Sequence, residues 1–358
     1  MGSEMCIRDS MGAATDARRA GAPPAPLDSL TGPLRNWAGG RIRQILLGQT
    51  EPSRRAAELV GPDRADPGLF GPDSVTWRVH GNLSMLIGGL RSLLLQTLHP
   101  LAMAGVAQHS DYRGDPGGRM RRTAQFVSTT TFGTTAEAEA AIERVRHIHR
   151  RVRGVSAAGV PYRADDPALL AWVHATEVDS FWRAYRRYGG GPGEHRVPRS
   201  EADRYVAEMA VVARRIGVLD PPRSAAELRE YLVGMRPVLR ATPETHDAVR
   251  FLLHPPTPRA ARPAYLVVAG GAVGLLPSFV RHELRLPLLP GVEPLVVRPA
   301  ARTLLDVLGW VMAPPPEPTA NPAGTRDPAA TPGPATCADP EAPRQEDQEN
   351  SGSSHQGK

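Results

Sequence analysis

The sequence predicts an all-α protein built around a single multi-helix domain. Three observations support this fold class: apolar residues recur at helical spacing between residues 77 and 312, helix-start signals precede several of these stretches, and no series of alternating apolar and polar residues indicates a sheet. The sequence also lacks the phosphate-binding patterns GxGxxG and GxxxxGK[ST], the nucleophile pattern GxSxG and the zinc pattern HExxH.

Composition divides the chain into four parts. Residues 5–10, MCIRDS, are what the codons of a sequencing-adapter read encode, so we expect residues 1–10 to be an artefact. Residues 11–72 form an N-terminal extension rich in Pro, Gly and Arg, with a short amphipathic helix around residues 34–47, and residues 73–313 form the helical domain. Residues 314–358 are Pro-rich and acidic with few large apolar residues, which predicts a disordered tail.

Charge and cysteine content exclude several classes of protein. The tail holds seven acids and three bases, a net charge of −4, which leaves +10 for residues 1–313 of a chain whose total is +6. A basic body favours acidic ligands, haem propionates or anionic lipid, but no recognition motif accompanies it, so we expect no nucleic-acid partner. With two cysteines, one in the adapter-like segment and one in the tail, neither a disulfide framework nor a thiolate site is expected.

The longest apolar run, residues 264–280, is interrupted by glycines and slightly short for a membrane span. It predicts a buried or interfacial helix and allows peripheral membrane contact. No apolar stretch of the kind found in export signals follows Arg18 and Arg19, so we expect a cytoplasmic protein.

The helices follow from their start and stop signals. Residues 84–98 are apolar nearly all round and predict a central helix, and Pro100 can open a second apolar helix that runs to residue 108. Asp115-Pro116 and Asp166-Pro167 each read as an N-cap followed by Pro at the first helical position. A capping box begins a further helix at residue 134, with Gly154 as its stop. Later helices are expected over residues 201–216, 224–240, 244–254, 264–284 and 300–312.

Three of these helices place polar groups on faces that should be buried. Arg119 and Thr123 are four residues apart and share one face, although a solvated Arg and a Thr bonded to its own backbone is the ordinary alternative. His149 lies on the apolar stripe of its helix, whereas His147 shares the opposite face with charged residues. His149 is therefore the candidate ligand, although a lone buried His is more often a core residue.

The helix from residue 167 to about residue 188 carries His174 and Glu177 within an apolar stripe, and the helix over residues 201–216 adds Glu208. These three side chains could bind a non-haem metal, because imidazole and carboxylate are ligands that iron and manganese accept. His99 precedes a proline and is expected to cap a helix, and His109 is expected to tie a turn. Contact with a cofactor is the alternative role for both.

Four strings together resemble the oxygenase MpaB / rubber oxygenase (latex clearing protein) catalytic-domain family. They are LLLQTLHPLAMAGVAQHSDYRGDPGGRMRRT (93–123), HRRVRG (149–154), YRADDPALLAWVHATEVDSFW (162–182) and DRYVAEMAVVARRIGV (203–218). The resemblance covers residues 73–290. It implies a globin-like helical core around haem b, with His149 as the axial ligand of the haem iron and the pair Arg119 and Thr123 lining the haem pocket.

The chemistry that the resemblance implies is cleavage of a carbon–carbon double bond by O₂, giving two carbonyl fragments. Rubber oxygenases carry a glutamate before the Arg/Thr pair, but residues 81–110 contain no Asp or Glu. A small isoprenoid, terpenoid or lipid is therefore a better expected substrate than rubber. No electron donor is identifiable. A haem or apolar-ligand carrier of the same fold, and a non-haem metal oxidase using His174, Glu177 and Glu208, are the alternatives.

Overall fold

A computed structural model of the chain describes residues 66–111, 114–190, 198–287 and 291–312. The chain divides into two units, Met1–Pro315 and Pro316–Lys358. The second unit, the expected helix at residues 34–47 and the adapter-like residues all lie outside the described ranges.

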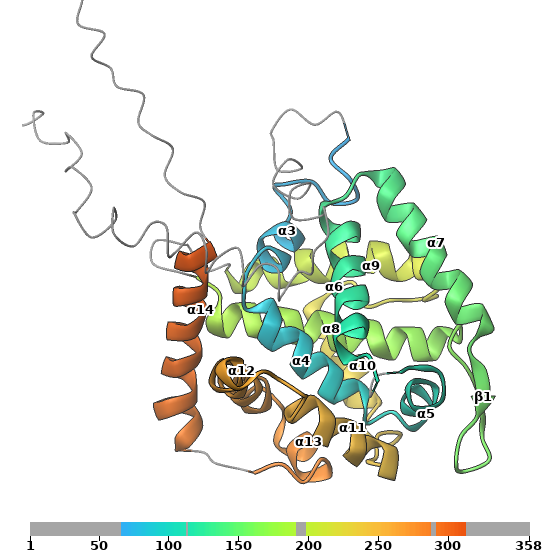
Figure 1. Cartoon of the computed structure of the whole chain (residues 1–358). Coiled ribbons are helices and arrows are strands. Elements are labelled where there is room, and N and C mark those ends of the chain that lie inside the picture. Colours follow the sequence, from blue (N-terminus) through green and yellow to red (C-terminus); the bar gives the residue numbers. More distant parts are fainter. Residues whose placement is uncertain (1–65, 112–113, 191–197, 288–290, 313–358) are drawn as a thin grey trace, which may run out of the picture. The chain divides into compact units, whose positions relative to one another are not determined.

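The regular secondary structure of the described residues is helical apart from one two-stranded hairpin, which confirms the predicted fold class (Figure 1). The α-helices are α3 (Val75–His80), α4 (Met85–Gln96), α5 (Pro100–His109), α6 (Pro116–Phe132), α7 (Thr135–Arg151), α8 (Pro167–Tyr188), α9 (Ala202–Ile216), α10 (Ala225–Gly234), α11 (Pro243–Leu253), α12 (Arg262–Gly274), α13 (Ser278–Glu283) and α14 (Arg298–Met312). Short helical turns at Arg199–Glu201, Arg259–Ala261 and Glu293–Val297 complete the helical structure.

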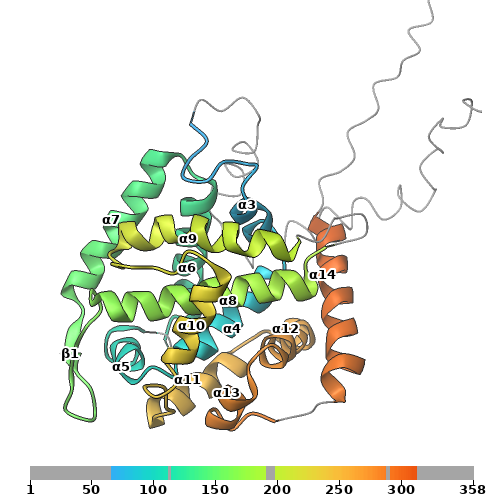
Figure 2. The same ribbon diagram turned by 180° about the vertical axis from the view of Figure 1, so that it is seen from behind.

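Helix α8 runs through the middle of the domain, and α4 lies along it (Figures 1 and 2). The two helices approach closely because Gly88 of α4 has no side chain. A Cβ atom at Gly88 would lie 3.1 Å from the Phe181 ring and 3.2 Å from the Ala184 Cβ. The main apolar core extends from this contact to α12 and α14, and Trp172 of α8 is its largest fully buried member.

An ion pair is buried inside the α4–α8 contact. Arg91, 1% exposed, places its Nη2 2.8 Å from an Asp179 carboxylate oxygen and donates through Nη1 to the Ser180 hydroxyl at 2.6 Å. Its Nε donates to the Leu275 carbonyl oxygen at 3.0 Å, which joins α4 to the end of α12. The buried charge is thus neutralised and hydrogen-bonded, as a buried charge must be.

The predicted helix starts are confirmed. Asp115 accepts a hydrogen bond from the Gly118 amide, Asp166 accepts from the Ala168 amide, and Thr134 forms both halves of a capping box with Glu137. Each of these signals depends only on residues within one turn, which is why the sequence identifies them.

Three helix boundaries differ from the prediction. Helix α7 ends at Arg151, and Gly154 lies in a two-stranded antiparallel hairpin, β1 (Arg153–Val155) with β2 (Pro161–Arg163). A Cβ atom at Gly154 would lie 2.5 Å from the Tyr162 hydroxyl, so this glycine permits a close approach instead of stopping a helix. The helix expected over residues 264–284 is two helices, because Pro277 cannot continue α12 and precedes α13. The helix expected over residues 224–240 ends at Gly234.

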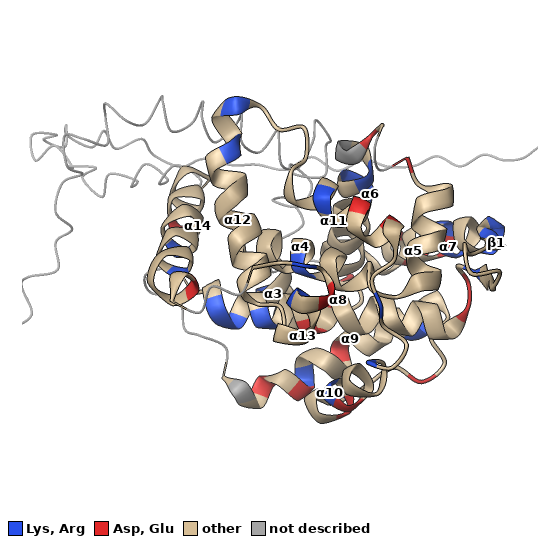
Figure 3. Cartoon of the chain, turned by 90° about the horizontal axis from the view of Figure 1, so that it is seen from below, with Lys and Arg blue, Asp and Glu red and all other residues tan. Residues whose placement is uncertain are grey.

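Basic and acidic positions are interspersed along the helices in the view from below, and both kinds occur on α10 (Figure 3). The apolar run 264–280 is divided between α12 and α13, and only Ala269, Gly271 and Ala272 of α12 are fully buried. Among the residues that the structure describes, no helix combines the length and the apolar character needed to cross a membrane.

Candidate functional site

Helix α6 carries the Arg119–Thr123 pair, but the two side chains have different surroundings. Arg119 is half-buried and donates from its guanidinium to the Ser110 hydroxyl, which follows α5. Thr123 is exposed, and its hydroxyl donates to the Arg119 carbonyl oxygen at 3.2 Å. The expectation that Thr123 lies on a buried face is therefore wrong. Its hydroxyl makes the local backbone bond that is ordinary for Thr in a helix.

Helix α7 turns His149 inward and leaves His147 exposed, as its periodicity predicts. His149 is half-buried, and its Nδ1 atom is enclosed without a hydrogen-bond partner. Burial lowers the pKa of His149, partly opposed by the charge of Asp165, so the imidazole is neutral at neutral pH. The apolar stripe is less buried than expected at Ile148, which is 46% exposed.

A pocket of about 160 Å³ adjoins His149. It lies between the end of α7, the approach to α8 and the end of α9, and is lined by His149, Arg146, Arg150, Asp165, Leu170, Ile216 and Gly217. Neither Arg119 nor Thr123 belongs to this lining. The structure therefore does not bring the three expected site residues together around this pocket.

Helix α8 holds His174 and Glu177 in its interior face. Burial lowers the pKa of His174 to about 4 and raises the pKa of Glu177 to about 7. Both groups are thus held close to their neutral forms, which is the effect that desolvation has on an imidazole and on a carboxyl. Their helical spacing is as predicted, with Glu177 one turn after His174.

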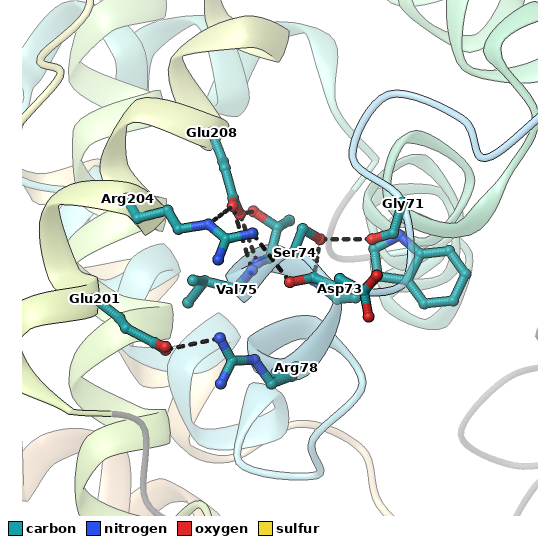
Figure 4. Close-up of polar contacts among 10 residues, drawn as sticks. Gly71, Asp73, Ser74, Val75, Arg78, Glu201, Arg204 and Glu208 are labelled. Atoms are coloured by element: carbon teal, nitrogen blue, oxygen red, sulfur yellow. Dashed lines mark hydrogen bonds and ion pairs between the residues drawn. The ribbon is translucent and has the colours of Figure 1, made fainter.

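Glu208 is turned toward the start of α3 (Figure 4). Its carboxylate accepts hydrogen bonds from the Thr76 amide at 2.9 Å, from the Thr76 hydroxyl at 2.8 Å and from the Val75 amide at 3.3 Å. Arg204 donates to it at 2.9 Å. An anion at a helix N-terminus is stabilised by the free amides there, so Glu208 has a structural role.

The expected non-haem metal site is therefore wrong. The described part of the chain contains no group of three or more His, Cys, Asp or Glu side chains placed to hold a metal ion. Glu208 bonds to α3 instead of joining His174 and Glu177.

His99 and His109 have the structural roles that the sequence predicts. His99 is buried and accepts a hydrogen bond from the Ala102 amide, which caps α5. His109 lies at the end of α5, where its Nε2 is 3.1 Å from the Arg153 carbonyl oxygen and ties α5 to β1. Neither contact requires a cofactor.

Sequence analysis missed a buried polar chain that joins α6, α3 and α9. The His80 Nδ1 lies 2.7 Å from the Thr131 hydroxyl, and its Nε2 lies 3.1 Å from the Tyr205 hydroxyl. Burial lowers the pKa of His80 to about 3. His80 lies 51 residues from Thr131 and 125 residues from Tyr205, so no local pattern could reveal the chain.

Comparison with known families identifies the family of the chain. The family model described as ER-bound oxygenase mpaB/B'/Rubber oxygenase, catalytic domain, matches residues 77–316. The chain belongs to this family. It is therefore an oxygenase and an oxidoreductase, and the matched segment includes every candidate site residue named above. No curated protein and no solved structure matches the chain.

A haem can be tested against the residues present. A histidine that holds haem iron must be a neutral imidazole with a nitrogen free to coordinate, and His149 has an enclosed Nδ1 without a partner and a lowered pKa. The donor therefore fits. The adjoining pocket of about 160 Å³ is smaller than the roughly 300–1,000 Å³ of most ligand pockets, so in this structure it does not enclose a whole macrocycle.

Proposed function

We propose that the protein is a haem-b-dependent oxygenase that cleaves the double bond of a small apolar alkene with O₂. The observation that carries this proposal is His149, because its buried Nδ1 is unpartnered and its imidazole is neutral. The family supplies the reaction class. An isoprenoid, terpenoid or lipid is the proposed substrate class, and no nucleic acid is a proposed partner.

In this proposal His149 would hold the haem iron, and a reduced haem bound there would supply the binding and activation of O₂. Arg119, which does not line the pocket beside His149, would offer a half-buried cation, already oriented by Ser110, to an oxygen atom of a ligand bound against α6. The apolar residues of α4 and α5 would hold the alkene and exclude water. One alkene and one O₂ give two carbonyl groups, so the cleavage itself consumes no electrons from a donor.

A pair of histidine variants tests the ligand. The full chain is purified with haem present, and haem content is measured from the visible spectrum and a pyridine haemochrome assay. His149→Ala is expected to lose most of the haem, whereas His147→Ala, two residues away on the exposed face of α7, is expected to keep it. Far-UV circular dichroism establishes that both variants are folded.

Two results would contradict the proposal. Full haem content and an unchanged spectrum in His149→Ala would show that another residue is the ligand. Wild-type protein that binds no haem after reconstitution would remove the haem mechanism. Carbonyl products from an alkene in the presence of O₂ separate an oxygenase from a carrier of the same fold.

A further inference from the structure

The end of α7 and the β1–β2 hairpin that follows it carry an excess of positive charge. Residues 143–165 contain six arginines and two acids, a net charge of +4, and no Asp or Glu lies between Glu143 and Asp165. All six arginines are exposed, and they are Arg144, Arg146, Arg150, Arg151, Arg153 and Arg163. A surface with an excess of one sign attracts a partner of the opposite charge.

The two acids of this segment compensate only part of its charge. Glu143 lies 2.9 Å from Arg150 and 3.5 Å from Arg146, and Asp165 lies 2.8 Å from Arg163. Among the residues that the structure describes, no acidic side chain lies within ion-pair distance of the other three arginines, which are Arg144, Arg151 and Arg153. These three cations are therefore available to an anionic partner.

The hairpin also holds two arginines opposite each other. Arg153 of β1 and Arg163 of β2 are direct partners across the antiparallel ladder, and like charges in this arrangement destabilise a hairpin. The Arg153 Nε donates to the Arg150 carbonyl oxygen at 3.1 Å, a bond that orients the guanidinium without neutralising it. An anion bound on this side would relieve the repulsion.

The inner face of the hairpin is fastened to α5, so its outer face is presented in a fixed direction. The buried Tyr162 donates to the Gln108 side chain at 2.7 Å, and Gln108 donates to the Val155 carbonyl oxygen at 2.9 Å. The His109 Nε2 lies 3.1 Å from the Arg153 carbonyl oxygen. Because side chains alternate along a strand, Arg153 and Val155 point outward while Tyr162 points inward. The hairpin extends from the end of α7 at the edge of the domain (Figures 1 and 2).

The tip of the hairpin is apolar and exposed. Val155 is 55% exposed and Val160 is 44% exposed, and between them lie Ser156, two exposed alanines and Gly159. Gly159, with a φ of +78°, donates from its amide to the Ser156 carbonyl oxygen at 2.9 Å and closes the turn. On the adjacent end of α7, Ile148 is 46% exposed and shares a face with Arg144 and Arg151.

Exposed apolar side chains surrounded by arginines fit the interface of a lipid bilayer. There the arginines meet anionic headgroups, and the apolar side chains enter the boundary with the acyl chains. A nucleic acid would use the arginines but leave Val155 and Val160 in water, and the aromatic side chain of the hairpin, Tyr162, is buried and cannot stack on bases. Anionic lipid is therefore the partner that uses both features of this surface.

We propose that the end of α7 and the β1–β2 hairpin, residues 144–163, dock the protein on an anionic lipid surface. Arg144, Arg151 and Arg153 bind headgroups, and the hairpin tip with Val155 and Val160 enters the interface. The docking does not rest on the proposed function, since it requires neither haem nor catalysis. Arg146 and Arg150 of this segment also line the pocket beside His149, so docking brings that pocket next to the apolar molecules dissolved in a membrane.

Vesicle binding by the full, haem-free chain tests the proposal. Sedimentation measures binding to vesicles of phosphatidylcholine alone and of phosphatidylcholine mixed with phosphatidylserine, at low and at high salt. One variant combines Arg144→Ala, Arg151→Ala and Arg153→Ala, and a second combines Val155→Ser and Val160→Ser. The control removes the same amount of charge elsewhere, by changing three exposed arginines to Ala, namely Arg223, Arg229 and Arg259. Far-UV circular dichroism establishes that each variant is folded.

Wild-type protein is expected to bind the phosphatidylserine vesicles much more tightly than phosphatidylcholine alone, and more weakly at high salt. An arginine near an anionic surface contributes about fivefold to binding, so the first triple variant should lose on the order of 100-fold, while the control changes little. The valine variant should lose about tenfold, because its tip no longer enters the interface.

Three results would overturn the docking surface. Wild-type protein that does not bind the phosphatidylserine vesicles, or a first triple variant that binds as wild type does, would show that residues 144–163 do not bind lipid. Equal losses in the two triple variants would show that overall charge alone drives binding. A valine variant that binds like wild type, together with equal affinity for duplex DNA or polyglutamate, would identify the surface as a site for acidic macromolecules instead.

Discussion

Replacing Glu177 with Gln is expected to stabilise the protein, and to do so increasingly as the pH rises. Burial raises the pKa of Glu177 from 4.5 to about 7 in the folded state. Below pH 4.5 the carboxyl is protonated in both the folded and the unfolded chain, so it has little effect on stability. Between pH 4.5 and about pH 7 the Glu177 carboxyl binds a proton in the folded state that it has lost in the unfolded state. The free energy of unfolding therefore falls as the pH rises.

The magnitude follows from the same pKa values. At about 1.4 kcal/mol per pKa unit, ionising Glu177 lowers the stability of the folded protein by roughly 3 kcal/mol once the pH exceeds its folded pKa. Buried histidines act in the opposite direction. His174, with a pKa lowered from 6.5 to about 4, and His80, lowered to about 3, are protonated more readily in the unfolded chain, so they reduce stability as the pH falls.

The two effects oppose each other in wild-type protein, so the informative quantity is the difference between Glu177→Gln and wild type. Both proteins contain the same histidines, whose contributions cancel in that difference. Urea unfolding followed by far-UV circular dichroism measures the free energy of unfolding of both proteins at about pH 5 and about pH 8. The stability advantage of Glu177→Gln should grow by roughly 2–3 kcal/mol between these values. An advantage that does not change with pH would show that Glu177 has an ordinary pKa.

Three further predictions concern contacts that hold the helices together, each measured by urea unfolding. Asp179→Ala should destabilise the fold by about 3–5 kcal/mol because it leaves the Arg91 charge buried without its partner; a loss under about 1 kcal/mol would contradict this. Glu208→Ala should cost about 1–3 kcal/mol by freeing the amides that begin α3, and unchanged stability would show that water replaces it. Gly88→Ala should cost about 1–3 kcal/mol, because the new methyl group would crowd Phe181; a neutral result would mean that α4 and α8 can separate freely.

Features that depend on neighbouring residues were predictable from the sequence. The caps at Asp115, Thr134 and Asp166 each bond to an amide within the next three residues, and the structure confirms all three. The inward direction of His149 and the outward direction of His147 follow from helical periodicity in the same way.

Features that depend on distant segments were not predictable. The face that carries Thr123 was expected to be buried, but burial requires a partner element, and periodicity does not identify one. Glu208 was expected near His174, but it bonds to α3, more than 130 residues earlier in the chain. The break at Pro277 is different, since the proline was visible in the sequence and local chemistry alone accounts for it.

Glu177 and Asp179 show where sequence reasoning about the site reaches its limit. The two acids lie two residues apart on one helix, and the apolar stripe predicted burial for Glu177 but identified no partner for either carboxyl. Packing gives them different surroundings: Asp179 forms an ion pair with Arg91 of α4, whereas Glu177 is desolvated by burial. One carboxyl therefore holds helices together as an anion, and the other keeps a proton near neutral pH. The chemical role of each follows from which helix covers that side of α8, and that arrangement arises only when segments far apart in the sequence come together.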